Sequence, residues 1–124
     1  MKAVLIVEDD PDIQLLIQAL FAMDPRFLVA GLVDSADKAI EMTSAVSPEI
    51  IVLDDNLAGA TRGIDALPQI KAAAPDAKII MFTSHQETRA RTDGDPSVDS
   101  FQLKTDIGEL LPVAQQLTHL LALI

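Results

Sequence analysis

Short, unbroken apolar runs are the feature of this sequence that most restricts its fold. Residues 3–7 read AVLIV and residues 50–53 read IIVL, and neither run contains a polar side chain. A strand with one face in water alternates apolar and polar residues, so an unbroken run predicts a strand buried on both faces. The chain must therefore cover both faces of its sheet with other elements.

Helical patterns separate the predicted strands, which lie at residues 3–7, 27–32, 50–53, 78–82 and 100–103. Strands that alternate with helices indicate a parallel sheet with helices on both faces, and the crossovers of such sheets are right-handed. We expect a single domain over residues 1–124 of the α/β class, with a doubly wound five-stranded parallel sheet in a three-layer α/β/α arrangement.

Capping signals predict where two helices begin. Asp10 precedes Pro11, and Ser35 precedes the second helical pattern. Short polar side chains just before a helix accept hydrogen bonds from its first amides, and proline suits its first position. The first helix is expected to bury a face of four apolar residues, Ile13, Leu16, Ile17 and Leu20.

Two prolines restrict the helices of the C-terminal half. Pro68 lies within a helical pattern and is expected in the first turn, where an amide N–H has no partner. Asp106 and Glu109 resemble a capping box, which predicts a last helix that opens there and runs through Leu121. Pro112 is expected to kink that helix or to delay its start.

Composition excludes several classes of protein. The chain has 19 acidic and 9 basic residues, a formal charge of −10, which repels a phosphate backbone, so direct nucleic-acid binding is not expected. Because there is no cysteine, disulfides, thiolate zinc sites and cysteine nucleophiles are excluded. No apolar run approaches the roughly 20 residues of a membrane span, and the N-terminus lacks the pattern of a signal peptide. We expect a cytoplasmic protein without membrane contact.

Polar side chains follow the predicted strands at the edge where such sheets bind ligands. Glu8 and Asp9 follow the first strand, Asp54 the third, Thr83 the fourth and Lys104 the fifth. Two carboxylates ~5 Å apart repel by roughly 3 kcal/mol, so a group of them retains a proton or binds a cation. Oxygen ligands favour Mg²⁺. A carboxylate nucleophile, a metal, a hydroxyl and an ammonium group are what phosphoryl transfer requires.

Neighbouring polar residues have simpler explanations. Asp10 is better explained as a helix cap than as a ligand, and Asp55 should point away from Asp54 as a solvated acid, because successive side chains of a strand alternate in direction. His85 follows the fourth strand. It is expected to be exposed, although its position beside the site would let it tune the loss of phosphate.

Four motifs stand in an order and at separations typical of one family: VEDDPDI, PEIIVLDDNL, IIMFTS and FQLK. On these motifs the chain resembles the receiver domains of bacterial two-component response regulators, from about residue 2 to residue 122. Residues 27–41 and the segment GIDALPQIK resemble receivers that precede a helix-turn-helix domain. The resemblance implies a flavodoxin-like fold and a Mg²⁺-dependent phosphoacceptor of signal transduction, not an enzyme with a separate substrate or organic cofactor.

The resemblance also implies a role for each matching residue. Asp54 matches the phosphoacceptor. Asp9 matches the acid that binds Mg²⁺ directly, and Glu8 matches its neighbour, which acts largely through water. Asn56 matches the position whose backbone carbonyl completes the metal shell.

Three further residues match positions that respond to the phosphoryl group. Thr83 matches the switch hydroxyl, Lys104 the lysine that pairs with the phosphoryl group, and Phe101 the aromatic that changes rotamer. The implied donor is a phosphohistidine on a sensor histidine kinase or phosphotransfer protein, and the implied output is an attached domain or a protein target. Four apolar residues could cap the core, form a homodimer face or lead into another domain: Leu120, Leu121, Leu123 and Ile124.

The sequence departs from the family pattern in four places. Ala58 and Thr105 stand where receivers usually have proline, and the loop before Gly63 is one residue longer. A trans bond is expected before Thr105, because a cis bond there would cost about 2.5–4 kcal/mol, and Lys104 is then expected to point differently. Residues 86–98 lack apolar periodicity, which predicts a short or frayed fourth helix.

These departures keep a second hypothesis open, a pseudo-receiver that binds proteins and does not switch by phosphorylation. Mg²⁺ affinity without acyl phosphate formation would favour it. A Mg²⁺-dependent phosphatase would need a second acid where Asn56 stands and room for a substrate cap. A flavin-binding module of similar fold would need a Ser/Thr/Gly-rich phosphate loop after the first strand, where the chain has acids.

Overall fold

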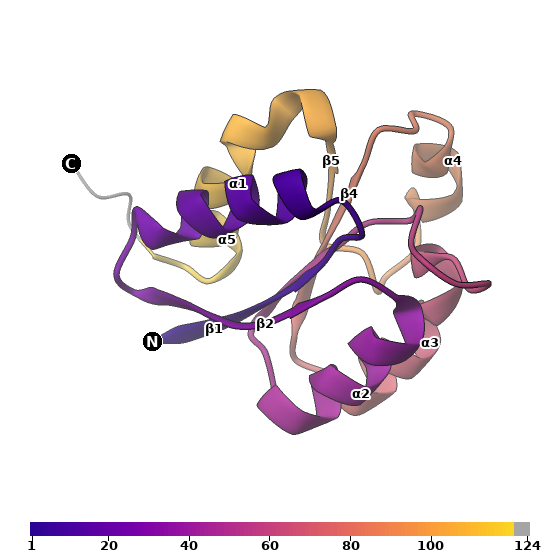
Figure 1. The fold of residues 1–124 in the computed structure, drawn as a ribbon, viewed down its shortest axis with the longest axis horizontal. Coiled ribbons are helices and arrows are strands. Elements are labelled where there is room, and N and C mark those ends of the chain that lie inside the picture. The colour runs from indigo at the N-terminus through magenta and orange to yellow at the C-terminus, as the bar shows by residue number, and fades with distance from the viewer. Residues whose placement is uncertain (121–124) are drawn as a thin grey trace.

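A computed structural model describes residues 1–120 and shows one parallel sheet at the centre of the molecule (Figure 1). Its five strands lie in the order β2-β1-β3-β4-β5, and the sheet confirms the doubly wound topology predicted from the sequence. The strand bounds are β1 Lys2–Val7, β2 Phe27–Val33, β3 Ile50–Leu53, β4 Lys78–Thr83 and β5 Ser100–Leu103.

Helices cover both faces of the sheet. Figure 1 shows α1 (Pro11–Ala22) and α5 (Leu110–Leu117) on one face, and α2 (Ala36–Val46) and α3 (Gly63–Ala73) on the other. The fourth helix, α4 (Thr88–Thr92), lies beside the last two strands and has only five residues, which confirms the expected short helix. None of the helices within residues 1–120 combines the length and apolar character needed to cross a membrane.

Alternation along the strands builds two separate apolar cores. Val4 and Ile6 of β1 pack into the core under α1 and α5, whereas Leu5 and Val7 pack into the core under α2 and α3. All four side chains are fully buried. Because both faces of the sheet are covered, neither set can be polar, and the unbroken apolar runs follow from this requirement.

The predicted caps of α1 and α2 are confirmed. The Asp12 amide donates to Asp10 Oδ1 at 2.9 Å, with Pro11 at the first helical position. The Lys38 amide donates to Ser35 Oγ at 3.3 Å. Each cap satisfies an amide that has no partner within its own helix, and each helix therefore begins where the sequence predicts.

The predicted buried face of α1 is wrong at Leu16, whose side chain is 53% exposed. Ile17 is buried, and Ile13 and Leu20 pack at the edge of the core. Phe21 completes the buried stripe instead. Residues four apart lie on one face of a helix, so the stripe follows 13, 17 and 21, and position 16 turns toward water.

The predicted capping box of the last helix does not form. Lys104–Glu109 is a 3₁₀ segment in which Asp106 has non-helical angles, φ −103° and ψ 33°, and α5 begins at Leu110 without a side-chain cap. An α-helix opening at Asp106 would set Pro112 against the carbonyl of Gly108, where proline has no hydrogen to donate. The delayed start expected from Pro112 is therefore confirmed, and Leu121 lies outside the described residues.

The expected place of Pro68 in the first turn of its helix is also wrong. Because α3 begins at Gly63, Pro68 is its sixth residue and lies on the exposed side. Two hydrogen bonds fix this early start, from the Gly63 amide to the Asp55 carbonyl at 2.9 Å and from the Ile64 amide to Asp55 Oδ1 at 3.0 Å. Contacts outside the helix thus outweigh the local preference of proline.

Gly63→Ala is predicted to destabilise the protein by about 3 kcal/mol or more, because an added Cβ would lie 2.0 Å from the Asp54 carbonyl oxygen and force two backbone segments apart. Gly108→Ala is the matched control, since its Cβ would meet nothing within 4 Å; it should change stability by less than about 1 kcal/mol. Urea unfolding of both variants measures the difference. Equal effects would contradict the close approach at Gly63.

Candidate functional site

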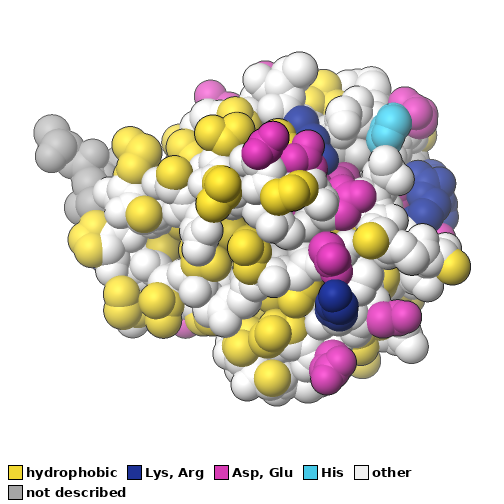
Figure 2. Space-filling model, viewed as in Figure 1, with side chains coloured by type: hydrophobic (Ala, Val, Ile, Leu, Met, Phe, Trp, Pro, Cys, Tyr) yellow, Lys and Arg dark blue, Asp and Glu magenta, His cyan; other side chains and the backbone are white. Residues whose placement is uncertain are grey.

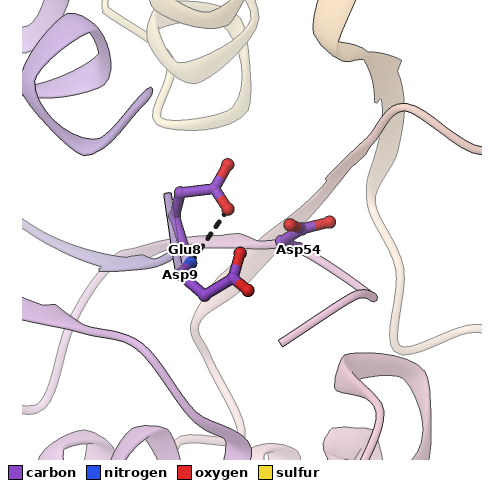
Figure 3. Close-up of side chains that lie close together, drawn as sticks. All are labelled: Glu8, Asp9 and Asp54. Carbon is purple, nitrogen blue, oxygen red and sulfur yellow. Dashed lines mark hydrogen bonds between the residues drawn. The ribbon is translucent and has the colours of Figure 1, made fainter. Parts of the chain in front are cut away.

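The candidate site lies where the winding direction of the sheet reverses, between β1 and β3. The next strand along the chain is added on one side of β1 for β2 and on the other for β3, and sheets of this kind bind ligands at such a reversal, outside the carboxyl ends of the strands. Glu8 and Asp9 follow β1, and Asp54 follows β3. Each of these three residues offers an oxygen within 4.8 Å of the other two (Figure 3).

The three carboxylates differ in their exposure to solvent. Glu8 and Asp54 are 1% and 2% exposed, whereas Asp9 is exposed to solvent. The Asp9 amide donates to Glu8 Oε2 at 2.9 Å and holds that carboxylate in place. Figure 2 shows acidic side chains gathered around this end of the sheet. The site thus presents one open and two buried carboxylates to a cation.

Lys104 supplies the positive charge of the site. Its Nζ lies 2.9 Å from Asp54 Oδ2 and 2.5 Å from Glu8 Oε1. No cis peptide bond occurs within residues 1–120, so the expected trans bond before Thr105 is confirmed. The expectation that Lys104 would then point differently is wrong, because its side chain reaches the carboxylates directly from the end of β5.

Burial and charge shift the protonation of the site. Burial, followed by the neighbouring Asp54 carboxyl, raises the pKa of Glu8 from 4.5 to about 7, against the opposing effect of Lys104. Burial alone would lower the pKa of Lys104, but its hydrogen bonds to Glu8 and Asp54 raise it instead. Within residues 1–120, buried Glu8 Oε1 has no partner apart from the Lys104 ammonium group, 2.5 Å away. One ammonium group therefore serves both Glu8 and Asp54.

Two other predicted residues lie at the same edge of the sheet. Thr83 is fully buried at the end of β4, and its Oγ1 accepts from the His85 amide at 3.3 Å. Asn56 is exposed, and its backbone amide donates to Asp54 Oδ1 at 3.3 Å. His85 is exposed as expected. The switch role of Thr83 and the carbonyl ligand of Asn56 stay predictions.

Phe101 belongs to a different set of contacts. It is half-buried in β5 and packs against the core under α2 and α3. The Arg89 guanidinium carbon of α4 lies 5.4 Å from the centroid of its ring, within the range of a cation–π interaction. Its change of rotamer stays a prediction.

Asp55 is not the solvated acid that the sequence predicts. It is 1% exposed and forms an ion pair with Arg62. It also accepts hydrogen bonds from the Ile64 amide at 3.0 Å and from Thr88 Oγ1 at 3.2 Å. Strand alternation turns Asp55 away from Asp54, but α3 and α4 cover that side. The sequence did contain a signal for this ion pair, because Arg62 stands directly before Gly63, the glycine that closes the loop.

Comparison with known proteins agrees with this geometry. The sequence model of the family described as "Response regulator receiver domain" matches residues 4–96. This chain belongs to that family. It is 32% identical over 102 residues to the nitrate/nitrite response regulator protein homolog of Haemophilus influenzae, covering 82% of this chain and 49% of that protein. It is 26% identical over 86 residues to NarL of Escherichia coli K12, covering 68% and 39%.

The chain spans about half, or less, of the length of these curated relatives. Among solved structures, the response regulator domain of CheB from Thermotoga maritima superposes with a TM-score of 0.83, at 19% identity, over 98% of this chain and 99% of that one. This likeness confirms the flavodoxin-like receiver fold.

The metal-free protein is predicted to lose stability as the pH rises from about 5 to about 8. The raised pKa of Glu8 means that the folded state binds its proton more tightly than the unfolded state, so the stabilisation is complete below about 4.5 and is lost as the pH passes about 7. The change should reach up to about 3 kcal/mol. Urea unfolding across this range measures it.

Glu8→Gln is the variant that isolates this effect, because the amide cannot ionise. Its stability should be nearly independent of pH over the same range and should exceed that of the unsubstituted protein at pH 8. Glu49→Gln, at a half-exposed carboxylate paired with Lys2, is the control and should keep the slope. A slope that survives Glu8→Gln would assign the effect to another group.

Proposed function

We propose that this receiver domain accepts a phosphoryl group on Asp54 from a phosphohistidine donor. The observation that carries the proposal is a buried carboxylate that pairs with Lys104 and has two other carboxylates within 4.8 Å. An Asp54 oxygen would attack phosphorus, the phosphorus–nitrogen bond of the donor would break, and the donor imidazole would take a proton from solvent. The product on this chain is an acyl phosphate.

The acidic cluster suits Mg²⁺ as the cation of this reaction. Glu8, Asp9 and Asp54 provide hard oxygen ligands, and Mg²⁺ typically takes one or two carboxylates while retaining waters. Lys104 is shared by Glu8 and Asp54, so a cation would offset negative charge that one ammonium group balances only in part. When bound, the ion would neutralise charge on the phosphoryl oxygens. The carbonyl of Asn56 is proposed as a further ligand.

Lys104 and Thr83 are proposed to stabilise the transferred group. The ammonium group already contacts the acceptor oxygen at 2.9 Å, so it can follow the negative charge onto the phosphoryl oxygens. The hydroxyl of Thr83 ends the neighbouring strand β4 and can donate to another oxygen of the group. Phe101, in the next strand β5, is proposed to change rotamer when Thr83 turns to the phosphoryl group. Together these residues would switch the surface that other proteins contact.

The family suggests the partners of this reaction. A sensor histidine kinase or a phosphotransfer protein would be the donor, and an attached output domain or a separate protein would read the switch. We propose a single receiver domain over residues 1–124, working in the cytoplasm, where ATP supplies the phosphohistidine. We also propose that it acts as a phosphoacceptor and not as an enzyme on a separate substrate.

Incubation with Mg²⁺ and acetyl phosphate is predicted to add one phosphoryl group, detected by intact mass. Asp54→Ala should abolish the adduct. Omission of Mg²⁺ should abolish it too, because Lys104 alone must then balance the three carboxylates and the incoming phosphoryl group. Asp37→Asn, at an exposed acid in the first turn of α2, is the control and should label normally. An adduct that persists in Asp54→Ala would place the acceptor elsewhere.

Mg²⁺ affinity, measured by titration calorimetry at pH 8, is predicted to fall by about tenfold or more in Asp9→Asn, because even an outer-shell change commonly costs this much. Lys104→Met should instead tighten Mg²⁺ binding several-fold, since the ammonium competes for the same oxygens, while it slows labelling by acetyl phosphate. Asp12→Asn, at an exposed acid of α1, is the control. Weaker Mg²⁺ binding in Lys104→Met would contradict the competition.

The pseudo-receiver is the second candidate, favoured by the five-residue α4 and by Ala58 and Thr105 at positions usually held by proline. In that case the protein would bind Mg²⁺ and take no phosphoryl group, either from acetyl phosphate or from a cognate kinase. The same mass measurement separates the two candidates, because only the phosphoacceptor gains mass.

A further inference from the structure

The helix α4 depends on its neighbours for its position. Its five residues are far fewer than an isolated helix needs to be stable in water. Its inner face consists of two buried threonines, Thr88 and Thr92, in place of large apolar side chains. Since apolar burial under it is small, polar contacts must account for much of what holds α4 on the molecule.

The most buried of these contacts leads to Asp55. Thr88 Oγ1 donates to Asp55 Oδ2 at 3.2 Å, and both side chains are 1% exposed. The same carboxylate pairs with Arg62 and accepts from the Ile64 amide at 3.0 Å. One buried carboxylate therefore joins the end of β3, the start of α3 and the start of α4.

A second polar contact of α4 is weaker. Arg91 NH2 lies 3.0 Å from Asp65 Oδ1, but both side chains are about half exposed, 48% and 52%. Exposed ion pairs of this kind contribute about 0–1 kcal/mol. A buried hydrogen bond to a charged acceptor contributes more, and its loss leaves an unsatisfied group. The contact between Thr88 and Asp55 is thus the main polar tie of the helix to the loop after β3.

Asp55 is also bonded directly to the acceptor residue. The Gly63 amide donates to the Asp55 carbonyl at 2.9 Å, and Gly63 is so close to the Asp54 carbonyl that no side chain fits between them. The peptide that joins Asp54 to Asp55 is therefore packed against the start of α3. A displacement of Asp54 must be taken up by Asp55 and by the groups that its carboxylate holds.

We propose that Asp55 is a positioning residue that ties the acceptor loop to α4, and that phosphorylation of Asp54 loosens this tie through Thr88. The inference rests on the proposed function, because it requires a phosphoryl group on Asp54. Conversion of the Asp54 carboxylate, with one negative charge, into an acyl phosphate with about two adds about one negative charge, one residue away from a buried carboxylate. The added charge repels the Asp55 carboxylate and displaces it from Thr88, so the hydrogen bond from Thr88 is weakened and α4 is released.

Hydrogen exchange without any phosphodonor tests the tie itself. Thr88→Val keeps the shape of the side chain but removes the donor, and the amides of α4 should then exchange about tenfold faster. Asp65→Asn is the matched control, since it removes the exposed ion pair to the same helix; its exchange should change by less than about twofold. Unchanged exchange in Thr88→Val would overturn the proposal, whether or not Asp54 accepts a phosphoryl group.

A fluorescent label at Ala90→Cys then tests the transmission, since Ala90 is exposed on α4 and the chain has no other cysteine. Phosphorylation by acetyl phosphate and Mg²⁺ should change the emission of the labelled protein. With Thr88→Val added, labelling of Asp54 should proceed within about twofold of the same rate, and the emission change should be much smaller. Asp55→Asn should reduce both the rate and the emission change.

The outcomes separate this inference from the proposed function. A full emission change in Thr88→Val would show that α4 responds by another route and would overturn the transmission through Asp55. A protein that gains no phosphoryl group would overturn the proposed function and the transmission with it, while the exchange measurement would still decide whether Asp55 holds α4.

Discussion

Two buried carboxylates, Glu8 and Asp54, share one ammonium group, and the arrangement of the sheet is what brings these three charges together. Each lies at the end of a different strand, β1, β3 and β5, and each strand is buried or half-buried along its length. The apolar cores on the two faces hold the strands in register. The unfavourable concentration of negative charge is thus imposed by packing, and the Lys104 ammonium group offsets part of it.

The fold could be predicted from the sequence because its signals are local and agree with one another. Unbroken apolar runs set the strands, and Asp10 and Ser35 set two helix starts. The residues of the charged site followed from their place after the strands, since the topology brings those ends to one edge. Lys104 shows this most clearly. The position of β5 directs its side chain to the carboxylates, although Thr105 replaces the proline that usually follows this lysine.

The errors occurred where distant contacts outweighed local preference. Asp55 was expected to face water because strand alternation predicts only the direction of a side chain. It does not predict which elements lie in that direction, and here α3 and α4 cover Asp55. Its carboxylate also fixed the start of α3, which placed Pro68 in the second turn. The prediction for Leu16 was wrong for a related reason, since packing against the sheet decides which positions of a helix are buried. The capping box at Asp106 was wrong for a local reason, because Pro112 delays the start of α5.

The place of Lys104 has a consequence for the order in which the chain is made. Glu8 and Asp54 are synthesised well before Lys104, and β1 and β3 pair directly with each other. A nascent chain that stops before residue 104 therefore carries both buried acids without their ammonium partner. Such a chain can close its central strands only by retaining a proton between the acids or by recruiting a cation from solution. The ammonium group that balances the acids after β1 and β3 thus follows the strand of this sheet that is made after the other four.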